Sequence, residues 1–392
     1  MAVPQDYDPL APETFDSPHA TFAELRRSCP MARSEAFDGF WMLTRHADIR
    51  AVLDEPLLYT TRVRNVVPGG SATGRRPPLH LDPPEHTPYR RAIDRALGAA
   101  RIEGMTAMIK GHADRLLRAY RHAGGGDLVD LYSSPLAALV FADWFFLDPN
   151  QSAHLWATSK EFVKAWEHFD AEAVSRTSAT LYDLARDLVA ERRRHPRSPD
   201  HDPISSLLAA TDADNVALPD EMLVGCVRQI LVVGLVAPPI FVGSVAVHLS
   251  RDQALQHRLR AEPELLPAAI EEFLRLYTPY RGFARAPVHE VMLHGRTVAA
   301  NEPIALAYAS ANRDETVFED PDCFRLDRPN IRQHLAFGRG PHRCAGMAMA
   351  RVELLVAVRA LLDGTTRFEL AGDVRMSGMP EVGPIYVPLR VV

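Results

Sequence analysis

The spacing of apolar and polar residues along the chain predicts a mainly helical protein. Apolar positions recur at helical intervals through most of the sequence, and short alternating segments near the N-terminus and in the last third predict β-strands. We expect a short helix at 44–53 capped by Thr44, a helix at 84–97, two helices within 151–195 and a helix that starts directly after position 344. Residues 62–78 are rich in Gly, Pro and Arg, which predicts a mobile loop.

The most apolar stretch lies at 230–247 and contains no charged residue. Its length is close to the ~18 to 20 residues that span a bilayer. Pro238 and Pro239 stand in its middle, however, and polar helical segments flank it, so a buried core helix over 218–250 is the better interpretation. Because proline has no N–H, we expect a kink here and free carbonyl groups near Gly234 and Leu235.

Composition narrows the class of protein. With 392 residues and 47% hydrophobic content the chain can bury a large core, and length alone would allow two or three domains. A net charge of −6 argues against a nucleic-acid partner. The four cysteines show neither zinc-like nor disulfide-like spacing, which suits a reducing cytoplasm. The first fifteen residues carry no signal or anchor pattern, so we expect a cytoplasmic protein without membrane attachment.

The candidate chemistry gathers in ten residues at 337–346, F-G-R-G-P-H-R-C-A-G. A thiolate ligand needs backbone N–H donors and the positive end of a helix near its sulfur. Gly338 and Gly340 permit a tight turn that brings amides toward Cys344, and the apolar periodicity beyond it predicts the required helix. Six residue types at these fixed offsets would coincide by chance at odds on the order of 10⁻⁶.

This segment resembles the haem-binding loop of the cytochrome P450 superfamily, soluble bacterial type. The resemblance covers nearly the whole chain and implies a mainly α fold with a small β region, as one large domain over residues 1–392. It implies haem b (iron protoporphyrin IX) as the cofactor and Cys344 as its proximal iron ligand, whose electron donation favours O–O cleavage. Phe337 would lie against the macrocycle, Gly338 and Gly346 would shape the loop, and His342 would donate to a propionate.

Three further residues resemble the family's haem contacts. His86 and Arg90 stand four apart on one helix face, like the His-x-x-x-Arg pair that holds the propionates. Arg285, in F-A-R-A-P-V-H-E, matches the propionate-binding arginine that follows the pocket-lining strand, with Arg281 as its rival for a charged contact. Without the cysteine loop, such residues are more often solvated surface charges.

A separate set resembles the family's structural core. Glu272 and Arg275 stand three apart on a helix, close enough to pair. They resemble the Glu-x-x-Arg pair that supports the haem core, and Arg328 would be its third member. The implied role is structural rather than catalytic.

The central helix departs from the family pattern. Relatives carry a small pair, then an acid and an alcohol that order water and relay protons during oxygen activation. Aligning Gly234 with the family glycine places Val236 and Ala237 at the acid and alcohol, followed by Pro238. Neither side chain can carry a proton. The remaining alternatives are a water or carbonyl relay, a proton from the substrate, hydrogen peroxide as oxidant, or chemistry without dioxygen scission.

The resemblance implies an oxidoreductase that performs hydroxylation, demethylation, epoxidation or oxidative coupling on a small or medium organic molecule, in specialised metabolism or catabolism. We expect two groups of residues around the substrate. The first is Val66 and Val67, on a loop that also carries Arg62, Arg64 and Asn65. The second is Leu235, Ala237, Tyr280 and Phe283. If the arginines face inward, a substrate with a carboxylate or several polar groups is expected.

No flavin or dinucleotide fingerprint is present, so electrons would come from a separate ferredoxin and ferredoxin reductase. A patch of Arg91, Arg95, Arg339 and Arg343 could receive an acidic ferredoxin, and ordinary surface charge is an equally good explanation. Two other functions stay open. One is a peroxide-driven peroxygenase or peroxidase-type oxidase, and the other is a noncatalytic P450-like partner or scaffold protein.

Overall fold

The computed structural model describes residues 5–15, 17–69 and 74–392. The helices are α1 (Pro12–Phe15), α2 (His19–Ser28), α3 (His46–Asp54), α4 (His86–Ala96), α5 (Ala99–His122), α6 (Ser134–Trp144), α7 (Pro149–Glu167), α8 (Ala171–Arg194), α9 (Pro203–Leu208), α10 (Asp220–Val233), α11 (Ala237–Arg251), α12 (Gln253–Ala261), α13 (Leu266–Leu276), α14 (Tyr308–Ala311) and α15 (Met347–Gly364). The strands are β1 (Met31–Ser34), β2 (Phe40–Leu43), β3 (Tyr59–Thr60), β4 (Gly125–Asp127), β5 (Phe283–Pro287), β6 (Val291–Leu293), β7 (Arg296–Val298), β8 (Ile304–Leu306), β9 (Phe368–Leu370), β10 (Arg375–Met376), β11 (Pro384–Tyr386) and β12 (Pro388–Val391).

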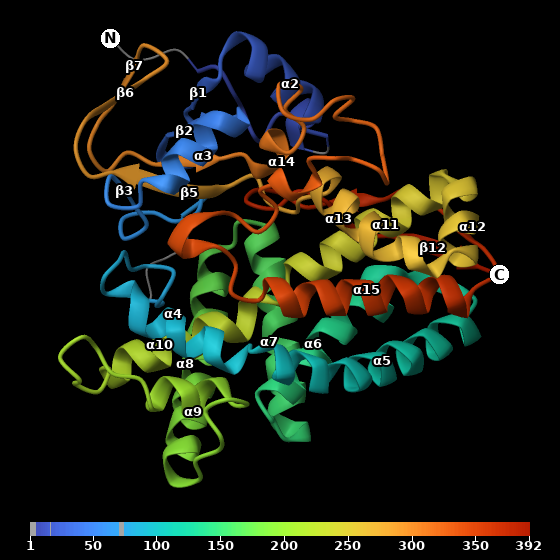
Figure 1. Cartoon of the computed structure of the whole chain (residues 1–392), viewed down its shortest axis with the longest axis horizontal. Helices are drawn as coiled ribbons and strands as arrows, with labels where there is room; N and C mark the ends of the chain where they lie inside the picture. The colour runs from blue at the N-terminus through green and yellow to red at the C-terminus, as the bar shows by residue number, and fades with distance from the viewer. Residues whose placement is uncertain (1–4, 16, 70–73) are drawn as a thin grey trace.

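The strands and the long helices occupy different parts of the molecule. Figure 1 shows β1, β2, β3 and β5 gathered with α2 and α3 on one side, while α5, α6, α8, α10 and α15 form the opposite side. The larger sheet has the order β1-β2-β8-β5-β3, and the remaining strands form small sheets of two or three. A mainly helical chain with a small β region is therefore what the periodicity predicted.

The larger sheet is buried on both faces, because side chains alternate along each strand. Phe40 and Met42 of β2 pack into one apolar cluster, and Trp41 and Leu43 pack into another on the opposite face. Strand β8 pairs in parallel with β2, Trp41 lying opposite Ile304, and antiparallel with β5. This arrangement fixes β5, which carries Arg285, between β8 and β3.

The largest core lies among the helices. It joins buried side chains of α5, α6, α8, α10, α11 and α15 into one cluster. α15 packs along α5 and also contacts α11. Two helices in this layer start at side-chain caps: Asp148 accepts from the amides of Asn150 and Gln151 at α7, and Asp170 accepts from that of Ala173 at α8. The two helices predicted within 151–195 are confirmed.

The apolar segment at 218–250 forms two helices rather than one kinked helix. α10 ends at Val233 and α11 begins at Ala237, so Pro238 and Pro239 stand in the first turn of α11. Proline is tolerated there because the first turn has no intrahelical N–H bonds to lose. In the segment from Asp220 to Arg251, 78% of the most apolar window is buried, although its length and composition would suit a membrane span. The prediction of a buried core position is confirmed.

Two local predictions are wrong, and a third falls partly outside the described residues. Thr44 does not cap a helix: α3 begins at His46, and the Thr44 hydroxyl donates to the carbonyl of Pro30 at 3.4 Å. α15 begins at Met347 rather than directly after position 344, because the cysteine loop continues to Gly346. The 62–78 loop has no helix or strand in its described part, and its residues 70–73 lie outside the described residues.

A buried carboxylate joins α13 to the segment that leads into the cysteine loop. Glu272 accepts from Arg275 at 2.9 and 2.7 Å and from the Nε of Arg328 at 3.1 Å. The three side chains are at most 2% exposed. Arg275 also donates to the carbonyls of Asn312 and Cys323, at 2.9 and 3.1 Å. The predicted pairing of these three residues is confirmed, and it connects elements more than forty positions apart.

We expect Glu272→Gln to lower the free energy of unfolding by about 3 to 5 kcal/mol, because it leaves two buried guanidinium groups without their shared carboxylate. Urea unfolding followed by circular dichroism measures the change. Glu264→Gln, at an exposed position just before α13, is the control and should stay within about 0.5 kcal/mol of the wild type. Equal stability of the two variants would contradict the structural role of Glu272.

Candidate functional site

The cysteine loop is a tight turn built around two glycines. Gly338 and Gly340 have φ of +64° and +70°, a region that side chains strain. A Cβ on Gly340 would also lie 2.6 Å from the carbonyl oxygen of Leu53 at the end of α3. The amide of Cys344 donates to the carbonyl of Phe337 at 2.9 Å and closes the turn. The backbone therefore fixes the cysteine in a tight turn three residues before α15, and the predicted glycine turn is confirmed.

The Cys344 thiol lies in a desolvated position that also contains donors. Cys344 has accessible surface, yet desolvation raises the pKa of its thiol above the ordinary value. A hydrogen bond from the Gly346 amide and the charges of Arg90, Arg351 and Arg343 act in the opposite direction and favour the thiolate. The site thus keeps a neutral thiol when nothing is bound, and it is prepared to stabilise a thiolate that binds a cation.

Two histidines and an arginine meet beside the cysteine loop. The rings of His86, on α4, and His342, on the loop, lie 4.6 Å apart at 66°. Burial, together with the charges of Arg285, His86 and Arg90, lowers the pKa of His342 to about 2. Burial and the charge of Arg90 lower the pKa of His86 to about 4. His86 is 3% exposed, and its Nε2 has no partner among the described residues.

Arg285 and Arg90 lie beside these histidines and differ in burial and in hydrogen-bond partners. Arg285 is buried on β5 and donates to the carbonyl of Ala284 at 2.8 Å, and desolvation lowers its pKa. Arg90 donates to the carbonyls of Pro341 and Arg343, the first at 2.9 Å, and pairs with Asp94 at 2.8 Å. Arg90 therefore ties α4 to the cysteine loop in this structure, in addition to facing the histidines electrostatically.

One residue of this site was missed from the sequence. Asp82, just before α4, is buried and accepts from the Thr61 amide at 3.0 Å and from both threonine hydroxyls at 60 and 61. The Thr61 hydroxyl in turn lies 3.5 Å from the Nε2 of His342. Asp82 therefore positions the chain that faces His342. The sequence could have indicated this residue, because Asp82 stands directly before two prolines and a predicted helix.

Four of the expected substrate-pocket residues lie together. Val66 forms a β-bridge with Phe283, and the amide of Val67 donates to the carbonyl of Gly282 at 2.8 Å. The rings of Tyr280 and Phe283 lie 4.5 Å apart. Burial raises the pKa of Tyr280, and the nearby charges of Glu381 and Cys344 raise it further. Tyr280 therefore connects this group of residues to the cysteine.

The other expected pocket residues lie at the break between α10 and α11. Gly234 packs so closely against the ring of Phe141 on α6 that a Cβ would clash with it. Leu235 is buried, whereas Val236 and Ala237 are partly exposed. The carbonyls of Gly234 and Leu235 have Pro238 and Pro239 at their i+4 positions, so no helical N–H can reach them.

The arginines considered for the pocket are occupied elsewhere. Arg62 pairs with Asp82 and Glu85 at 3.4 and 3.1 Å, and Arg64 donates to the carbonyl of Phe37 at 3.4 Å. Arg281 is fully buried among carbonyls, including those of Thr14 and Glu381 at 2.7 and 2.8 Å. The idea that these three face inward toward a substrate is wrong, because each guanidinium satisfies local carbonyl or carboxylate groups.

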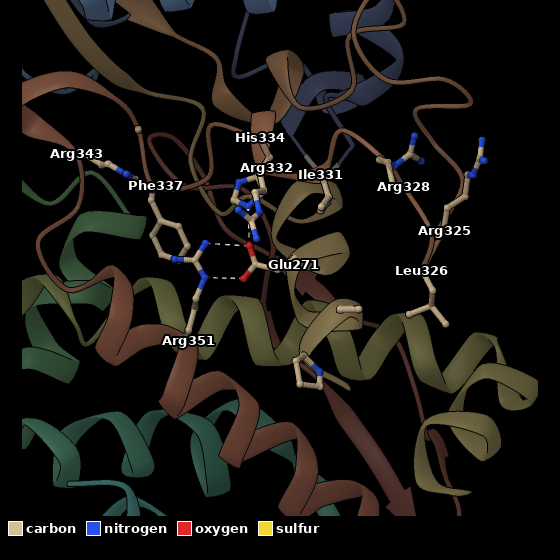
Figure 2. Close-up of a pocket in the computed structure, with 13 residues that line it drawn as sticks. Glu271, Arg325, Leu326, Arg328, Ile331, Arg332, His334, Phe337, Arg343 and Arg351 are labelled. Carbon is tan, nitrogen blue, oxygen red and sulfur yellow. Dashed lines mark hydrogen bonds and ion pairs between the residues drawn. The ribbon is translucent and has the colours of Figure 1, made fainter. Parts of the chain in front are cut away.

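A cavity of about 520 Å³ lies on the outer side of the cysteine loop. Figure 2 shows Glu271 at its centre, paired with Arg351 and His334, with Phe337 beside the Arg351 guanidinium. It is lined by Pro267, Ala268, Glu271, Arg325, Leu326, Arg328, Ile331, Arg332, His334, Phe337, Gly338, Arg343 and Arg351. Hydrogen bonds from Arg351 and His334 outweigh desolvation and lower the pKa of Glu271 to about 2. None of the expected substrate residues lines this cavity.

The four arginines of the expected basic patch are not equivalent. Arg95 pairs with Asp200 at 2.6 Å, and Arg339 pairs with Asp54. Arg91 and Arg343 are exposed without an ion pair among the described residues, and Arg343 borders the cavity beside the cysteine loop. Only part of the patch therefore offers uncompensated charge.

Comparisons with known proteins agree on one family, and the relatives cover more than nine tenths of the chain. A family model described as Cytochrome P450 matches residues 243–374. The chain is 31% identical over 400 aligned positions to linalool 8-monooxygenase of Pseudomonas putida, covering 96% of this chain and 97% of that protein. It is 33% identical to nocardicin C N-oxygenase of Nocardia uniformis subsp. tsuyamanensis, covering 93% and 91%.

Solved structures show the same similarity. A cytochrome P450 of Chondromyces apiculatus, CYP109Q5, superposes with a TM-score of 0.87 at 27% identity and 98% coverage of each chain. The cytochrome P450 PksS of the Bacillus subtilis bacillaene polyketide synthase superposes with a TM-score of 0.89 at 25% identity, covering 98% of this chain and 99% of that one.

The buried His86 predicts a pH-dependent stability of the ligand-free protein. Its folded-state pKa of about 4 lies below the ordinary value of 6.5, so below pH 6.5 the unfolded chain binds more protons. This contribution to the free energy of unfolding is therefore intact above pH 6.5 and falls by about 3 kcal/mol as the pH drops toward 4. We expect His86→Gln to lose less stability than the wild type over this range, as measured by urea unfolding.

His122→Gln, at an exposed position near the end of α5, is the matched control and should keep the wild-type pH profile. A profile of His86→Gln as steep as that of the wild type would show that His86 is not the buried neutral group inferred here.

Proposed function

Because this chain belongs to the cytochrome P450 family of haem-dependent monooxygenases, we propose that it oxidises a small or medium organic molecule with dioxygen and with electrons from a separate ferredoxin and ferredoxin reductase. The family resemblance and the mainly α fold expected from the sequence are confirmed by the comparisons. Hydroxylation, demethylation, epoxidation and oxidative coupling are the reaction types that we propose, in specialised metabolism. The relatives named above are a monooxygenase and an N-oxygenase.

The observation that carries the proposal is the meeting of an accessible thiol with two histidines and two arginines, of which His86 has an unpartnered ring nitrogen among the described residues. Cys344 lies in the loop three residues before α15, and His342, His86, Arg285 and Arg90 lie beside the adjacent part of the loop. Two guanidinium groups and two neutral imidazoles that can donate N–H fit the two propionates of haem b, and a desolvated thiol with an amide donor fits the iron. The unpartnered Nε2 of buried His86 is an independent sign that a polar group is missing from this place.

We assign roles to the residues on this basis. Cys344 would bind the iron, and Phe337, Gly338 and Gly346 would shape the loop around the sulfur. His86, Arg90, Arg285 and His342 would hold the propionates, while Val66, Val67, Leu235, Ala237, Tyr280 and Phe283 would face the substrate. When bound, the haem supplies the chemistry of oxygen activation, with the thiolate as electron donor. All of residues 1–392 would act as one haem-binding domain, located in the cytoplasm without nucleic-acid or membrane partners.

The distal residues modify how protons are delivered. Val236 and Ala237 carry no proton, so the acid and alcohol relay of the family is absent from this chain if Gly234 is the aligned glycine. The carbonyls of Gly234 and Leu235, which lack helical donors, can hold water in place of that relay. This same feature favours a second candidate function, oxidation driven by hydrogen peroxide, which already carries the protons that the relay would supply.

Electron delivery would use the exposed cations beside the cysteine loop. Arg91 and Arg343 remain without ion pairs among the described residues, and the cavity beside Arg343 contributes further guanidinium groups from Arg325 and Arg332. An acidic ferredoxin suits this surface because opposite potentials steer association.

We expect Cys344→Ala to abolish the thiolate-specific Soret band of the reduced carbon monoxide complex while far-ultraviolet circular dichroism stays unchanged. The reason is that the variant removes the only proposed sulfur ligand. Cys323→Ala, which removes an exposed cysteine, is the matched control and should keep the band. A wild-type protein with an imidazole-type band, or with none, would contradict the proposed function.

Restoring the relay tests the assignment of the distal residues. We expect the double variant Val236→Glu with Ala237→Thr to raise the amount of product formed per reducing equivalent with dioxygen, by about tenfold or more, because general acid catalysis contributes that much or more where it is limiting. Activity with hydrogen peroxide should not increase in the same variant. An unchanged yield with dioxygen would count against these two positions as the missing relay.

A further inference from the structure

A second group of basic side chains lies away from the cysteine loop, and it has no acidic partner among the described residues. Its centre is Arg228 on α10, which is 2% exposed. Two other fully buried arginines each pair with a carboxylate: Arg192 with Asp202 at 3.1 Å, and Arg275 with Glu272 at 2.7 Å. Arg228 donates to the hydroxyl of Ser178 at 2.9 Å and forms no ion pair among the described residues. Its Nε has no partner there either.

Aromatic rings account for part of this environment. The Arg228 guanidinium lies over Phe162 of α7 at 5.2 Å and over Tyr182 of α8 at 5.7 Å. Ring faces stabilise a cation, but they do not replace hydrogen-bond acceptors for a guanidinium group that has five N–H donors. The side chain is therefore oriented by its neighbours, while its Nε stays without a partner among the described residues.

The loop before α4 brings further cations to the same place. Burial and the charge of Arg76 lower the pKa of Arg228 to about 10. Burial and the charges of Arg76, Arg228 and Arg75 lower the pKa of His80 to about 4, and the Nε2 of His80 has no described partner. Among the described side chains, Tyr182 is the group that favours the charge on Arg76 and Arg228. We name the arginines Arg76 and Arg228, together with the neutral His80 beside them, the buried cationic cluster.

The position of the cluster connects it to the proposed substrate space. The Arg75 carbonyl packs against Gly225 of α10 and accepts from the Tyr182 hydroxyl at 3.4 Å, so the loop, α8 and α10 are in contact. Figure 1 shows α8 and α10 side by side. Arg228 lies six residues before Gly234, which is about 9 Å along a helix with a rise of about 1.5 Å per residue. Arg228 is therefore on α10, the helix that ends at the break, and lies between one and two turns before that end.

We propose that the buried cationic cluster binds the carboxylate of an organic acid, which is the substrate class of this enzyme. Buried charges are normally paired, and the missing partner here is an anion that the described chain does not supply. The planar guanidinium of Arg228 matches a carboxylate in a two-point arrangement, and the Arg76 guanidinium adds a second charge. This inference rests on the proposed function, because it names the substrate class of the proposed enzyme.

The distance restricts the acid further. The backbone at Arg228 lies about 9 Å along the helix axis from Gly234, so an acid held at Arg228 needs a length of this order to reach the break between α10 and α11. A medium-chain or aryl-alkyl carboxylate spans that length, whereas acetate does not. The oxidised carbon is then remote from the acid group.

The test measures binding of octanoate, dodecanoate and phenylbutyrate to the haem-loaded protein by calorimetry, with the methyl ester of each acid as its neutral counterpart. We expect the wild type to prefer each acid over its ester. Arg228→Gln and Arg76→Gln should weaken binding of the acids by about 10- to 100-fold, the effect of losing a charged hydrogen bond, and should leave the esters unchanged. Esters that bind the wild type as tightly as the acids would overturn the proposal.

Arg186→Gln is the matched control. Arg186 lies over the same Tyr182 ring at 5.9 Å, but it is exposed and pairs with Asp183, so its loss should not alter affinity for the acids. Arg228→Met separates a binding role from a structural one. Removing an unpaired buried charge should raise the melting temperature of the ligand-free protein, whereas a lower melting temperature with unchanged affinity for dodecanoate would overturn the proposal.

Two readouts keep this inference separate from the proposed function. The reduced carbon monoxide spectrum of the wild type reports the haem-thiolate site, and calorimetry reports the acid without using that spectrum. A normal spectrum without any preference for acids overturns only the carboxylate site. An abnormal spectrum with acid binding that depends on Arg228 overturns the proposed function and leaves the anion site in place.

Discussion

The ion pair network around Glu272 is the constraint on which the rest of this structure depends. A single carboxylate, 1% exposed, neutralises Arg275 and Arg328 inside the protein. Each arginine also binds the carbonyl of Cys323, at 3.1 and 3.0 Å, so the irregular chain before the cysteine loop is held to α13 by charged hydrogen bonds. Irregular backbone contributes little packing of its own. The network therefore holds this segment in place, and the loop at Phe337 to Gly346 follows from it toward α15.

The features that could be predicted from the sequence are those set by local chemistry. Periodicity located α7, α8 and α15, and the glycine turn identified the cysteine loop, because each depends on residues close together in the chain. Thr44 was a wrong helix cap because its hydroxyl found the carbonyl of Pro30 instead, a contact that no local pattern encodes. The segment with Pro238 and Pro239 was expected to be one kinked helix and is two helices, since prolines fit the start of a helix better than its interior.

The charged residues show the limit of sequence reasoning most clearly. Arg62, Arg64 and Arg281 looked like candidates for a substrate anion, yet each finds oxygen acceptors within the fold. Arg228 attracted no notice because it stands in a helix that is otherwise largely apolar. Whether a guanidinium is neutralised depends on which distant segments fold beside it, and that information is absent from spacing along one helix.

The break between α10 and α11 also changes the electrostatics at the centre of the molecule. Ending one helix and starting another creates a carbonyl end, with partial negative charge, beside an amide end, with partial positive charge. Two residues of the first turn of α11 are prolines and have no amide hydrogen. This interior helix start is therefore poor in donors, unlike the helix N-termini that bind anions, and water drawn into the break would serve mainly as a hydrogen-bond donor to the carbonyl groups.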